Sequence, residues 1–332
     1  MIRNPVRTAA KEVVSVSNDV SVNEARAQEL ADDLSRDELR LPAWELPVFL
    51  HEHEAPQRDV VNFLFLGNTI NFAFRDFETG EKYSVEYRGT EWGGAMGMWA
   101  ALRRAYEEDV PILDADFLQD ITIDDMERIF LHSGDVPLSM LSERRRIFEE
   151  VGEVLVRKYN GSFLDIIKKS DRKLFSPRGG IVDRLVNDMS SFRDVHQYTT
   201  KTHAAVVPFY KRAQLAPAMV MGKFQDVDED IVADPQRFTL FADYNLPNVL
   251  RYYGAISYSS KLSRRIDDGR LLISGTPFEI EIRAATVYAG DLILNSLRTE
   301  YDGIHAPHLD AALFHRRDDV ETQPHRCRTT DY

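Results

Sequence analysis

Apolar residues recur at helical spacing from Gly97 to near the end of the chain. Residues 143–159 show the pattern clearly, because these side chains share one side of a helix: Ile147, Val151, Val154 and Leu155. Asn160-Gly161 then supplies a typical helix end. The same reasoning predicts helices at 98–106, 180–189, 204–221, 246–258, 260–267, 279–297 and 309–316. A chain with this spacing is restricted to a mostly α fold.

Capping residues and prolines indicate where some helices begin or break. In residues 23–34 the apolar side chains fall three and four apart, which predicts an earlier helix. Thr122, followed by acidic residues at 124 and 125, has the pattern of a helix N-cap. Pro208 and Pro217 predict that the 204–221 helix is broken or starts late.

A different period appears before Gly97. Residues 71–74 and 83–87 are aromatic and β-branched runs that flank Thr79-Gly80. This pattern predicts a β-hairpin. The fold class expected from the sequence is therefore mostly α with a small hairpin or sheet near the N-terminus.

Domain boundaries follow from composition and breaker residues. Residues 1–20 are polar and without clear periodicity, so we expect an N-terminal arm. The rest, residues 21–332, is expected to be a single domain. The Pro- and Gly-containing stretch 176–180 marks a subdivision that the sequence leaves open.

Charge and cysteine content exclude several classes of protein. The net charge is −13, with 54 acidic and 41 basic residues, and such a surface repels DNA and RNA. The single cysteine, Cys327, excludes an internal disulfide framework and a cysteine-rich zinc site. Arg3, Arg7 and Lys11 are not followed by a signal-like apolar stretch, and no apolar run approaches ~20 residues. We therefore expect a cytoplasmic protein without a membrane segment.

Common catalytic signatures are absent from the sequence, including the Walker loop, the Rossmann glycines, Gly-x-Ser-x-Gly and His-Glu-x-x-His. His51-Glu52-His53 is the nearest approach to a metal pair, but it lacks a third ligand and is more typical of a polar loop. We expect no metal. Arg144-Arg145-Arg146 is expected to form a solvated helix face.

Two segments carry side chains that could do chemistry. In the first, Phe209 and Tyr210 precede Lys211 and Arg212. Adjacent cations beside aromatic rings could hold a phosphate group. They could equally be an ordinary surface pair at a helix start, and spacing alone leaves both interpretations open.

The second segment is Phe241-Ala242-Asp243-Tyr244, with Pro247 shortly after it. Asp243 or Asn245 could cap a helix that begins near the proline. Alternatively, Asp243 could point into a pocket walled by Phe241 and Tyr244. There a carboxylate could stabilise an oxocarbenium-like transition state or activate a water molecule. Local reasoning leaves both roles open.

At these two segments the sequence resembles the queuosine salvage proteins, the queuosine 5′-phosphate N-glycosylases. The resemblance extends over nearly the whole chain in one order. The matching stretches are 61–65, 71–74, 87–89, 143–145, 161–164, 191–194, 209–214, 241–244, 279–283 and 324–328.

The resemblance implies a reaction and a fold. The reaction would be hydrolysis of the N-glycosidic bond of queuosine 5′-phosphate, giving queuine and ribose 5-phosphate without a cofactor. The fold would be similar to that of helix-hairpin-helix DNA glycosylases. Asp243 would be the catalytic carboxylate, Lys211 would support it near the sugar or phosphate, and Phe241 with Tyr244 would line the base site.

The sequence departs from the family near its carboxyl end. The family motif Leu-Asp-Tyr-Tyr-Leu-Trp-Asp corresponds here to residues 309–315. Asp310 is kept and could accept hydrogen bonds from a 7-deazaguanine edge, whereas alanines replace both tyrosines and His315 replaces the last acid. Of His51 and His53, His51 is our choice for a family histidine at the base site, and His315 is a further candidate for substrate binding.

Two alternatives compete with the hydrolase. A base glycosylase acting on DNA or RNA would need a basic groove, which the charge of −13 disfavours. A non-catalytic binder of a modified nucleoside would tolerate the changes around Asp310. We expect a small-molecule substrate, queuosine 5′-phosphate, with no direct tRNA or DNA binding, and a monomeric protein.

Overall fold

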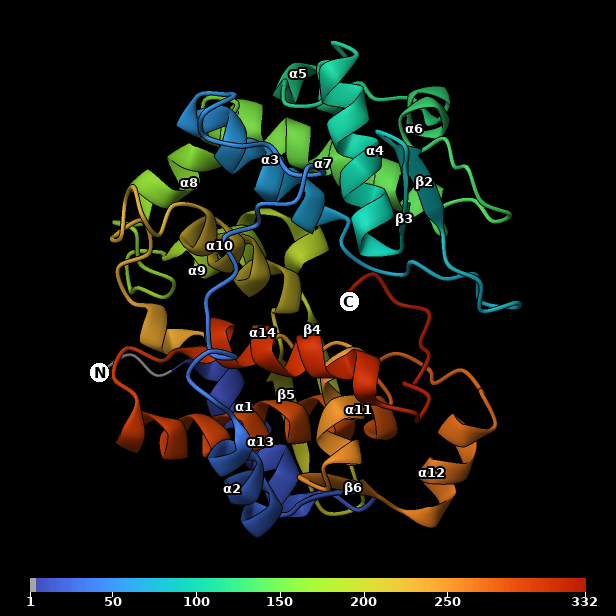
Figure 1. Cartoon of the computed structure of the whole chain (residues 1–332), viewed down its shortest axis with the longest axis vertical. Coiled ribbons are helices and arrows are strands. Elements are labelled where there is room, and N and C mark those ends of the chain that lie inside the picture. The colour runs from blue at the N-terminus through green and yellow to red at the C-terminus, as the bar shows by residue number, and fades with distance from the viewer. Residues whose placement is uncertain (1–3) are drawn as a thin grey trace.

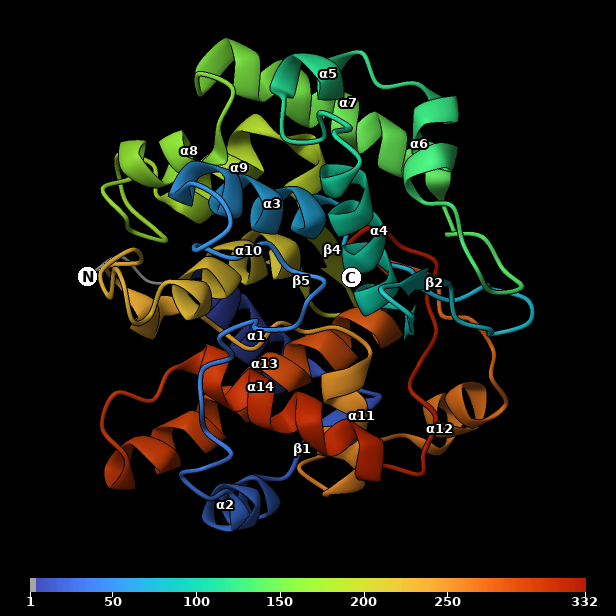
Figure 2. The same cartoon turned by 45° about the horizontal axis from the view of Figure 1, so that its top comes forward.

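The computed structural model describes residues 4–332, which form a mostly α protein with short antiparallel strands (Figure 1). The first helices are α1 (Pro5–Val16), α2 (Glu24–Asp33), α3 (Gln57–Thr69), α4 (Ala95–Glu107), α5 (Ala115–Gln119), α6 (Ile123–Ile129) and α7 (Leu141–Lys158). They are followed by α8 (Phe163–Lys169), α9 (Ile181–Asp188), α10 (Lys211–Lys223), α11 (Asn245–Tyr252), α12 (Ser260–Asp267), α13 (Pro277–Glu300) and α14 (Ala306–His315). Both views show helices stacked in an upper half, α3 to α10, and a lower half, α1, α2 and α11 to α14 (Figures 1 and 2).

The strands pair into small antiparallel sheets at separate places in the fold. Strand β1 (Val20–Val22) pairs with β6 (Ile256–Tyr258), and β4 (Val195–Thr199) pairs with β5 (Ala204–Pro208). Strands β2 (Ser84–Tyr87) and β3 (Thr90–Gly93) form a hairpin. The mostly α prediction is confirmed, but the strands are not confined to the N-terminal region.

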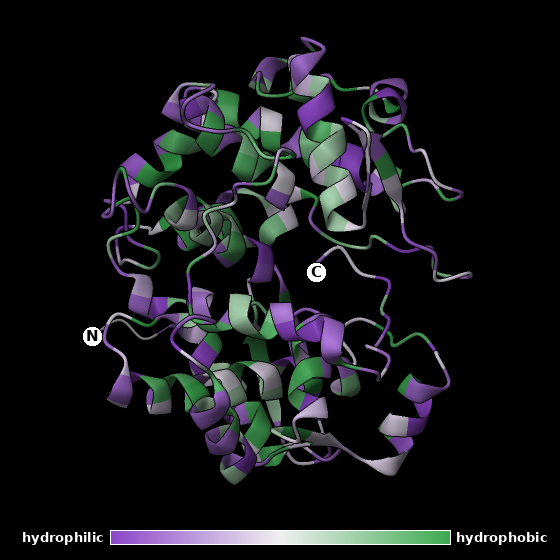
Figure 3. Cartoon of the chain, in the orientation of Figure 1, coloured by the Kyte–Doolittle hydropathy of each residue, from purple (hydrophilic) through white to green (hydrophobic). Residues whose placement is uncertain are grey.

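One hydrophobic core runs through both halves. It includes Phe63 and Trp99 in the upper half and Ile282 and Leu297 of α13 in the lower half. Most helices carry both hydrophobic and hydrophilic residues, as expected for helices with one packed face (Figure 3). The loop 176–180 joins α8 to α9 within the upper half, so it does not separate the two halves. None of the helices within residues 4–332 has the length and apolar content that a membrane span needs.

The segment expected to be an arm contains a packed helix. Asn4 caps α1 by accepting the N–H of Val6 at 2.9 Å. The buried face of α1 packs against α13 and consists of Val6, Ala9, Ala10 and Val13. These residues have the spacing of an amphipathic helix, but the polar residues between them made this pattern hard to recognise in the sequence. Residues 1–3, including Arg3, lie outside the described part of the chain.

The strand expected at residues 71–74 is wrong, because its carbonyl groups bind the buried side chains of Arg144 and Lys211. Arg144 has no solvent exposure and donates to the carbonyls of Ile70, Phe72 and Ala73, so it is not part of a solvated face. The turn at 76–80 does form, and an isolated bridge pairs Arg75 with Lys82. The true hairpin lies farther along, between β2 and β3.

The region 204–221 is divided in the way that its prolines indicate. β5 ends at Pro208, and α10 begins at Lys211 after Tyr210, whose φ of 53° is left-handed. Pro217 lies inside α10 without ending it. The predicted helix 246–258 also stops early, since α11 ends at Tyr252 and residues 256–258 form β6.

Candidate functional site

The start of α10 and the segment before α11 bring three predicted residues together. Lys211 is the first residue of α10, and the nearby charges of Asp243 and Asp310 act on its amine. The backbone N–H of Phe241 donates to Oδ2 of Asp310 at 2.9 Å, which ties α14 to the Asp243 segment. Asp243, Lys211 and Asp310 therefore form one cluster between the two halves of the fold.

Asp243 caps α11 with its carboxylate. Oδ1 accepts the N–H groups of Asn245 at 2.8 Å and of Leu246 at 3.0 Å, and Oδ2 accepts from the Asn245 amide at 3.0 Å. The N-cap position itself is Tyr244, and the side chain of Asp243 caps the helix from one residue before it. A carboxylate has about four lone-pair sites, and Asp243 keeps partial solvent exposure. Its oxygens can therefore also face a ligand.

Lys211 is a buried cation without a tight partner. Its side chain donates to the carbonyl of Asn71 at 3.5 Å, and within the described residues it makes no ion pair at 4.0 Å or less. Burial lowers its pKa to about 8, with Asp243 and Asp310 opposing the shift. The amine of Lys211 is thus mostly charged at pH 7, and it lies close to Asp243 and Asp310.

Arg212 does not share the role proposed for its neighbour. It is 2% exposed, and its guanidinium donates to the carbonyls of Thr69 and Ser191. It also lies over the rings of Phe72 at 5.2 Å and Phe192 at 5.4 Å. Both interpretations of a Lys-Arg pair, as a phosphate clamp and as a surface pair, are wrong for Arg212, which instead anchors the chain after α3.

Asp310 lies on α14 and is half-buried. Burial raises its pKa to about 8, and the charge of Asp243 adds to the shift. The carboxyl group is therefore mostly protonated at pH 7 and can donate a hydrogen bond as well as accept one. The two alanines after it, at 311 and 312, are both buried.

The two aromatic residues around Asp243 have different surroundings. Phe241 is 4% exposed and packs edge-on to Phe238, with 6.1 Å between the ring centres. Tyr244 is half-buried, and burial together with the charge of Asp243 raises its pKa to about 12. Phe241 thus anchors the segment in the core, while Tyr244 stays partly accessible beside the carboxylate.

The structure does not bring His51 or His315 to the cluster. His51 contacts Lys223 at 2.8 Å, at the far end of α10 and about 18 Å along the helix axis from Lys211. His315 is exposed at the end of α14, turned by roughly 140° from Asp310 around the helix.

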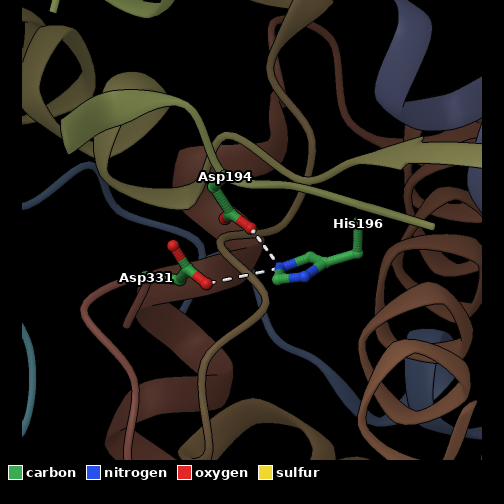
Figure 4. A group of neighbouring side chains, drawn as sticks. All are labelled: Asp194, His196 and Asp331. Carbon is green, nitrogen blue, oxygen red and sulfur yellow. Dashed lines mark hydrogen bonds and ion pairs between the residues drawn. The ribbon is translucent and has the colours of Figure 1, made fainter. Parts of the chain in front are cut away.

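Figure 4 shows a second group of side chains that the sequence patterns did not single out. Nε2 of His196 lies 3.2 Å from Oδ1 of Asp194 and 3.3 Å from Oδ2 of Asp331. Burial opposes protonation of His196, but its hydrogen bonds to the two aspartates raise its pKa to about 10. Asp194 lies within the family-like stretch 191–194, and this match was the sequence feature that could have pointed to the group.

These three side chains have the donor types of a metal site, and their ligand atoms lie within 4.8 Å of one another. However, Arg283 donates to both oxygens of Asp194, at 2.9 and 2.5 Å. Its Nη1 also lies 3.5 Å from Nε2 of His196. A metal ion would meet this fixed cation, so we interpret the group as a buried ion network.

Two surface hollows lie away from these residues. One of about 420 Å³ is lined by residues that include Arg58, Asp114 and Asn160. The other, of about 380 Å³, is lined by residues that include Lys261 and Phe278. Neither contains a predicted site residue, so the candidate site rests on the clustering of three titratable groups, those of Asp243, Lys211 and Asp310.

Comparison with known proteins gives consistent matches. The family model described as queuosine salvage protein matches residues 50–332. A queuosine 5′-phosphate N-glycosylase/hydrolase of Sphaerobacter thermophilus is 32% identical, over 98% of this chain and 97% of that protein. Proteins with the same name from Bos taurus and Mus musculus are 32% and 30% identical, each over 88% of this chain and 84% of the relative.

Proposed function

The chain belongs to the queuosine salvage protein family, and from this membership we propose that it is an N-glycosyl hydrolase that cleaves queuosine 5′-phosphate. The products are queuine, for reuse in tRNA modification, and ribose 5-phosphate. The observation that carries the proposal is the cluster of Asp243, Lys211 and Asp310, which combines an accessible carboxylate with a buried cation and a neutral carboxyl group.

Asp243 acts at the sugar. When the bond between C1′ and the base nitrogen breaks, the electron pair leaves with the base and positive charge develops on the ribose ring. A fixed carboxylate stabilises that charge and can accept a proton from the attacking water. The water oxygen becomes the C1′ hydroxyl of ribose 5-phosphate. The helix-cap bonds from Asn245 and Leu246 hold the carboxylate in place for this task.

Lys211 and Asp310 act on either side of Asp243. The Lys211 cation can contact the sugar or its phosphate. Asp310 in its protonated form can donate one hydrogen bond to the base while it accepts the bond from Phe241. The departing base takes up a proton at a ring nitrogen, since position seven of a deazapurine is carbon. Tyr244 adds an aromatic surface beside these groups.

Asp243→Asn tests the catalytic assignment. Asparagine caps helices as well as aspartate does, so the fold should persist while kcat for queuine release falls by about 10²- to 10⁴-fold. Release is measured by mass spectrometry after incubation with queuosine 5′-phosphate. Asp114→Asn is the matched control, because Asp114 caps α5 in the same way, with its side chain accepting the N–H of Asp116.

Wild-type release from Asp243→Asn would contradict the role of this carboxylate. Failure of the wild-type protein to release queuine would favour the second candidate, a non-catalytic binder of the modified nucleoside. The buried alanines at 311 and 312, where the family has tyrosines, are the observation that favours this candidate.

The salt dependence of DNA binding distinguishes a nucleic-acid base glycosylase from a nucleotide hydrolase. Because the net charge is −13, we expect queuine release to be unaffected by excess duplex DNA at low ionic strength. Tight binding of fluorescent duplex DNA that weakens steeply with added salt would contradict the nucleotide assignment.

The scaffold and the setting of the enzyme are also proposals. We propose that the fold is of the helix-hairpin-helix glycosylase type, which the mostly α architecture supports. We further propose a monomeric cytoplasmic protein. Light scattering after size exclusion tests the oligomeric state, and fractionation of cells tests the location.

A further inference from the structure

We propose that Arg283, acting through Asp194, is the positioning residue that fixes Asp243 and Lys211 relative to each other. This inference rests on the proposed function, because it assumes that these two residues carry the reaction. Arg283 itself has no solvent exposure and does not reach a substrate.

Arg283 first holds the segment that carries Asp243. Its Nε donates at 3.1 Å to the carbonyl of Ala242, the residue directly before the carboxylate. Ala242 is 2% exposed and packs in the same small hydrophobic cluster as Ile280 and Ala284 of α13. The backbone at Asp243 is therefore tied to α13 by packing and by a charge-assisted hydrogen bond.

Arg283 also holds the start of α10. Its two terminal nitrogens donate to the two oxygens of Asp194, at 2.9 and 2.5 Å. Oδ2 of Asp194 in turn accepts the backbone N–H of Lys211 at 3.2 Å. That N–H has no partner within the helix, and Tyr210 makes no capping bond with its own side chain. Asp194 thus caps α10 from the residue that precedes β4, 17 residues earlier in the chain.

Aromatic rings and neighbouring charges keep the guanidinium in one orientation. It lies over the rings of Phe209 at 4.1 Å and Tyr332 at 4.6 Å. Glu279 approaches it at 3.4 Å, and His196 also bonds Asp194, at the oxygen that Nη1 of Arg283 contacts. A single planar group therefore connects the two chain segments that carry the proposed catalytic residues, which lysine cannot reproduce.

Arg283→Lys tests the proposal. Lysine keeps the positive charge but lacks the planar guanidinium with its three donor nitrogens. It therefore cannot hold Ala242 and both oxygens of Asp194 together. We expect kcat per folded molecule to fall by about 10- to 100-fold, because a misplacement of 1 Å costs rates of this order. KM for queuosine 5′-phosphate should change less than threefold. The folded fraction is measured by circular dichroism in each sample.

Arg103→Lys is the matched control. Arg103 is 5% exposed and pairs with Glu54 and Glu107 in the upper half, outside the proposed site. This change should lower thermal stability while leaving kcat per folded molecule unchanged. If Arg283→Lys does not fold, Asp194→Asn supplies the same test, since its amide oxygen can cap α10 but cannot accept both arginine bonds.

The outcomes separate the two proposals. Normal kcat in folded Arg283→Lys, or in folded Asp194→Asn, together with an inactive Asp243→Asn, would overturn the positioning role alone. Normal activity of Asp243→Asn would overturn the catalytic assignment on which it rests. A reduced kcat with unchanged KM in the Arg283 or Asp194 variant, and not in the Arg103 control, supports the positioning role.

Discussion

Asp310 illustrates how burial changes what a side chain can do at neutral pH. In an unfolded chain its carboxyl group would lose its proton near 3.8, whereas in the folded protein its pKa is about 8. Between these values the folded state binds one more proton than the unfolded state, so the free energy of unfolding falls as pH rises. The enzyme keeps a hydrogen-bond donor beside Phe241 at the expense of stability.

Asp310→Asn should remove this stability loss. Asparagine has the shape of the protonated acid and no proton to release, so the melting temperature of the variant should exceed that of the wild type increasingly between pH 4 and pH 8. Differential scanning fluorimetry across this range measures the difference. The exposed Asp302→Asn is the control, and a constant difference from pH 4 to pH 8 would contradict the assignment.

The same variant has a consequence for activity. The free protein loses the neutral Asp310 and the charged Lys211 as pH rises through about 8, so kcat/KM should fall above that pH. In Asp310→Asn only Lys211 still titrates there, and the fall should be less steep. Initial rates of queuine release from pH 6 to pH 9.5 test this, and identical profiles would count against it.

At the residue scale, the sequence pointed to part of the candidate cluster. Asp243, Lys211 and Asp310 were named from motif resemblance and lie together in the structure. Arg212 was misjudged, because a charged side chain next to a motif can bond backbone carbonyls elsewhere. His51 and His315 lie away from the cluster, and their roles stay predictions. Arg283 was not singled out, since spacing cannot show that a helix interior residue bridges two distant segments.

At the element scale, the close approach of α13 to the site segment matters most. A Cβ atom at Gly290 would lie 2.4 Å from Cδ1 and Cγ of Leu240. Leu240 is three residues before Asp243, so the absence of a side chain at Gly290 allows the segment to lie against the helix.

Gly290→Ala should therefore harm the protein despite a gain in helix propensity. Alanine favours a helix by about 1 kcal/mol over glycine, but overpacking costs about 1–3 kcal/mol, occasionally more. We expect a net loss of unfolding free energy and a lower kcat, measured by urea unfolding and queuine release. The exposed Asn295→Ala on the same helix is the control. A stabilised, fully active Gly290→Ala would show that the contact relaxes without cost.

Elements were predictable where periodicity or capping was local. The N-cap at Thr122 and the helices α7 and α12 formed as expected. The short strands were mostly missed, because β1 pairs with β6 across more than two hundred residues and three-residue strands carry almost no pattern. The false strand at 71–74 had the right composition, but carbonyl groups in it accept hydrogen bonds from Arg144 of α7 and Lys211 of α10.

At the scale of the whole molecule, the ion network around Arg283 connects the last residues of the chain to both halves. Both views place the C-terminal end between the halves (Figures 1 and 2). His196 keeps its proton to about pH 10 because Asp194 and Asp331 bond it and Glu279 lies nearby, although Arg283 is close. An unfolded histidine loses its proton near 6.5.

His196→Gln should therefore change the alkaline stability of the protein. The histidine contributes stability that is fully present below pH 6.5 and is lost as pH rises through about 10. The difference in melting temperature between wild type and variant should shrink across this window. His132→Gln, at a partly buried histidine of the upper half, is the control. A difference that does not depend on pH would contradict a charged His196.

The packing of α1 on α13 has a consequence for protein synthesis. The ribosome finishes α1 at Val16 and does not begin α13 until Pro277, which is 277 − 16 = 261 residues later. At about 5–20 residues per second, roughly 13 to 52 s pass between the synthesis of α1 and that of α13. During that time the nascent chain exposes Val6 and Val13, a binding opportunity for chaperones that ends when translation is nearly complete.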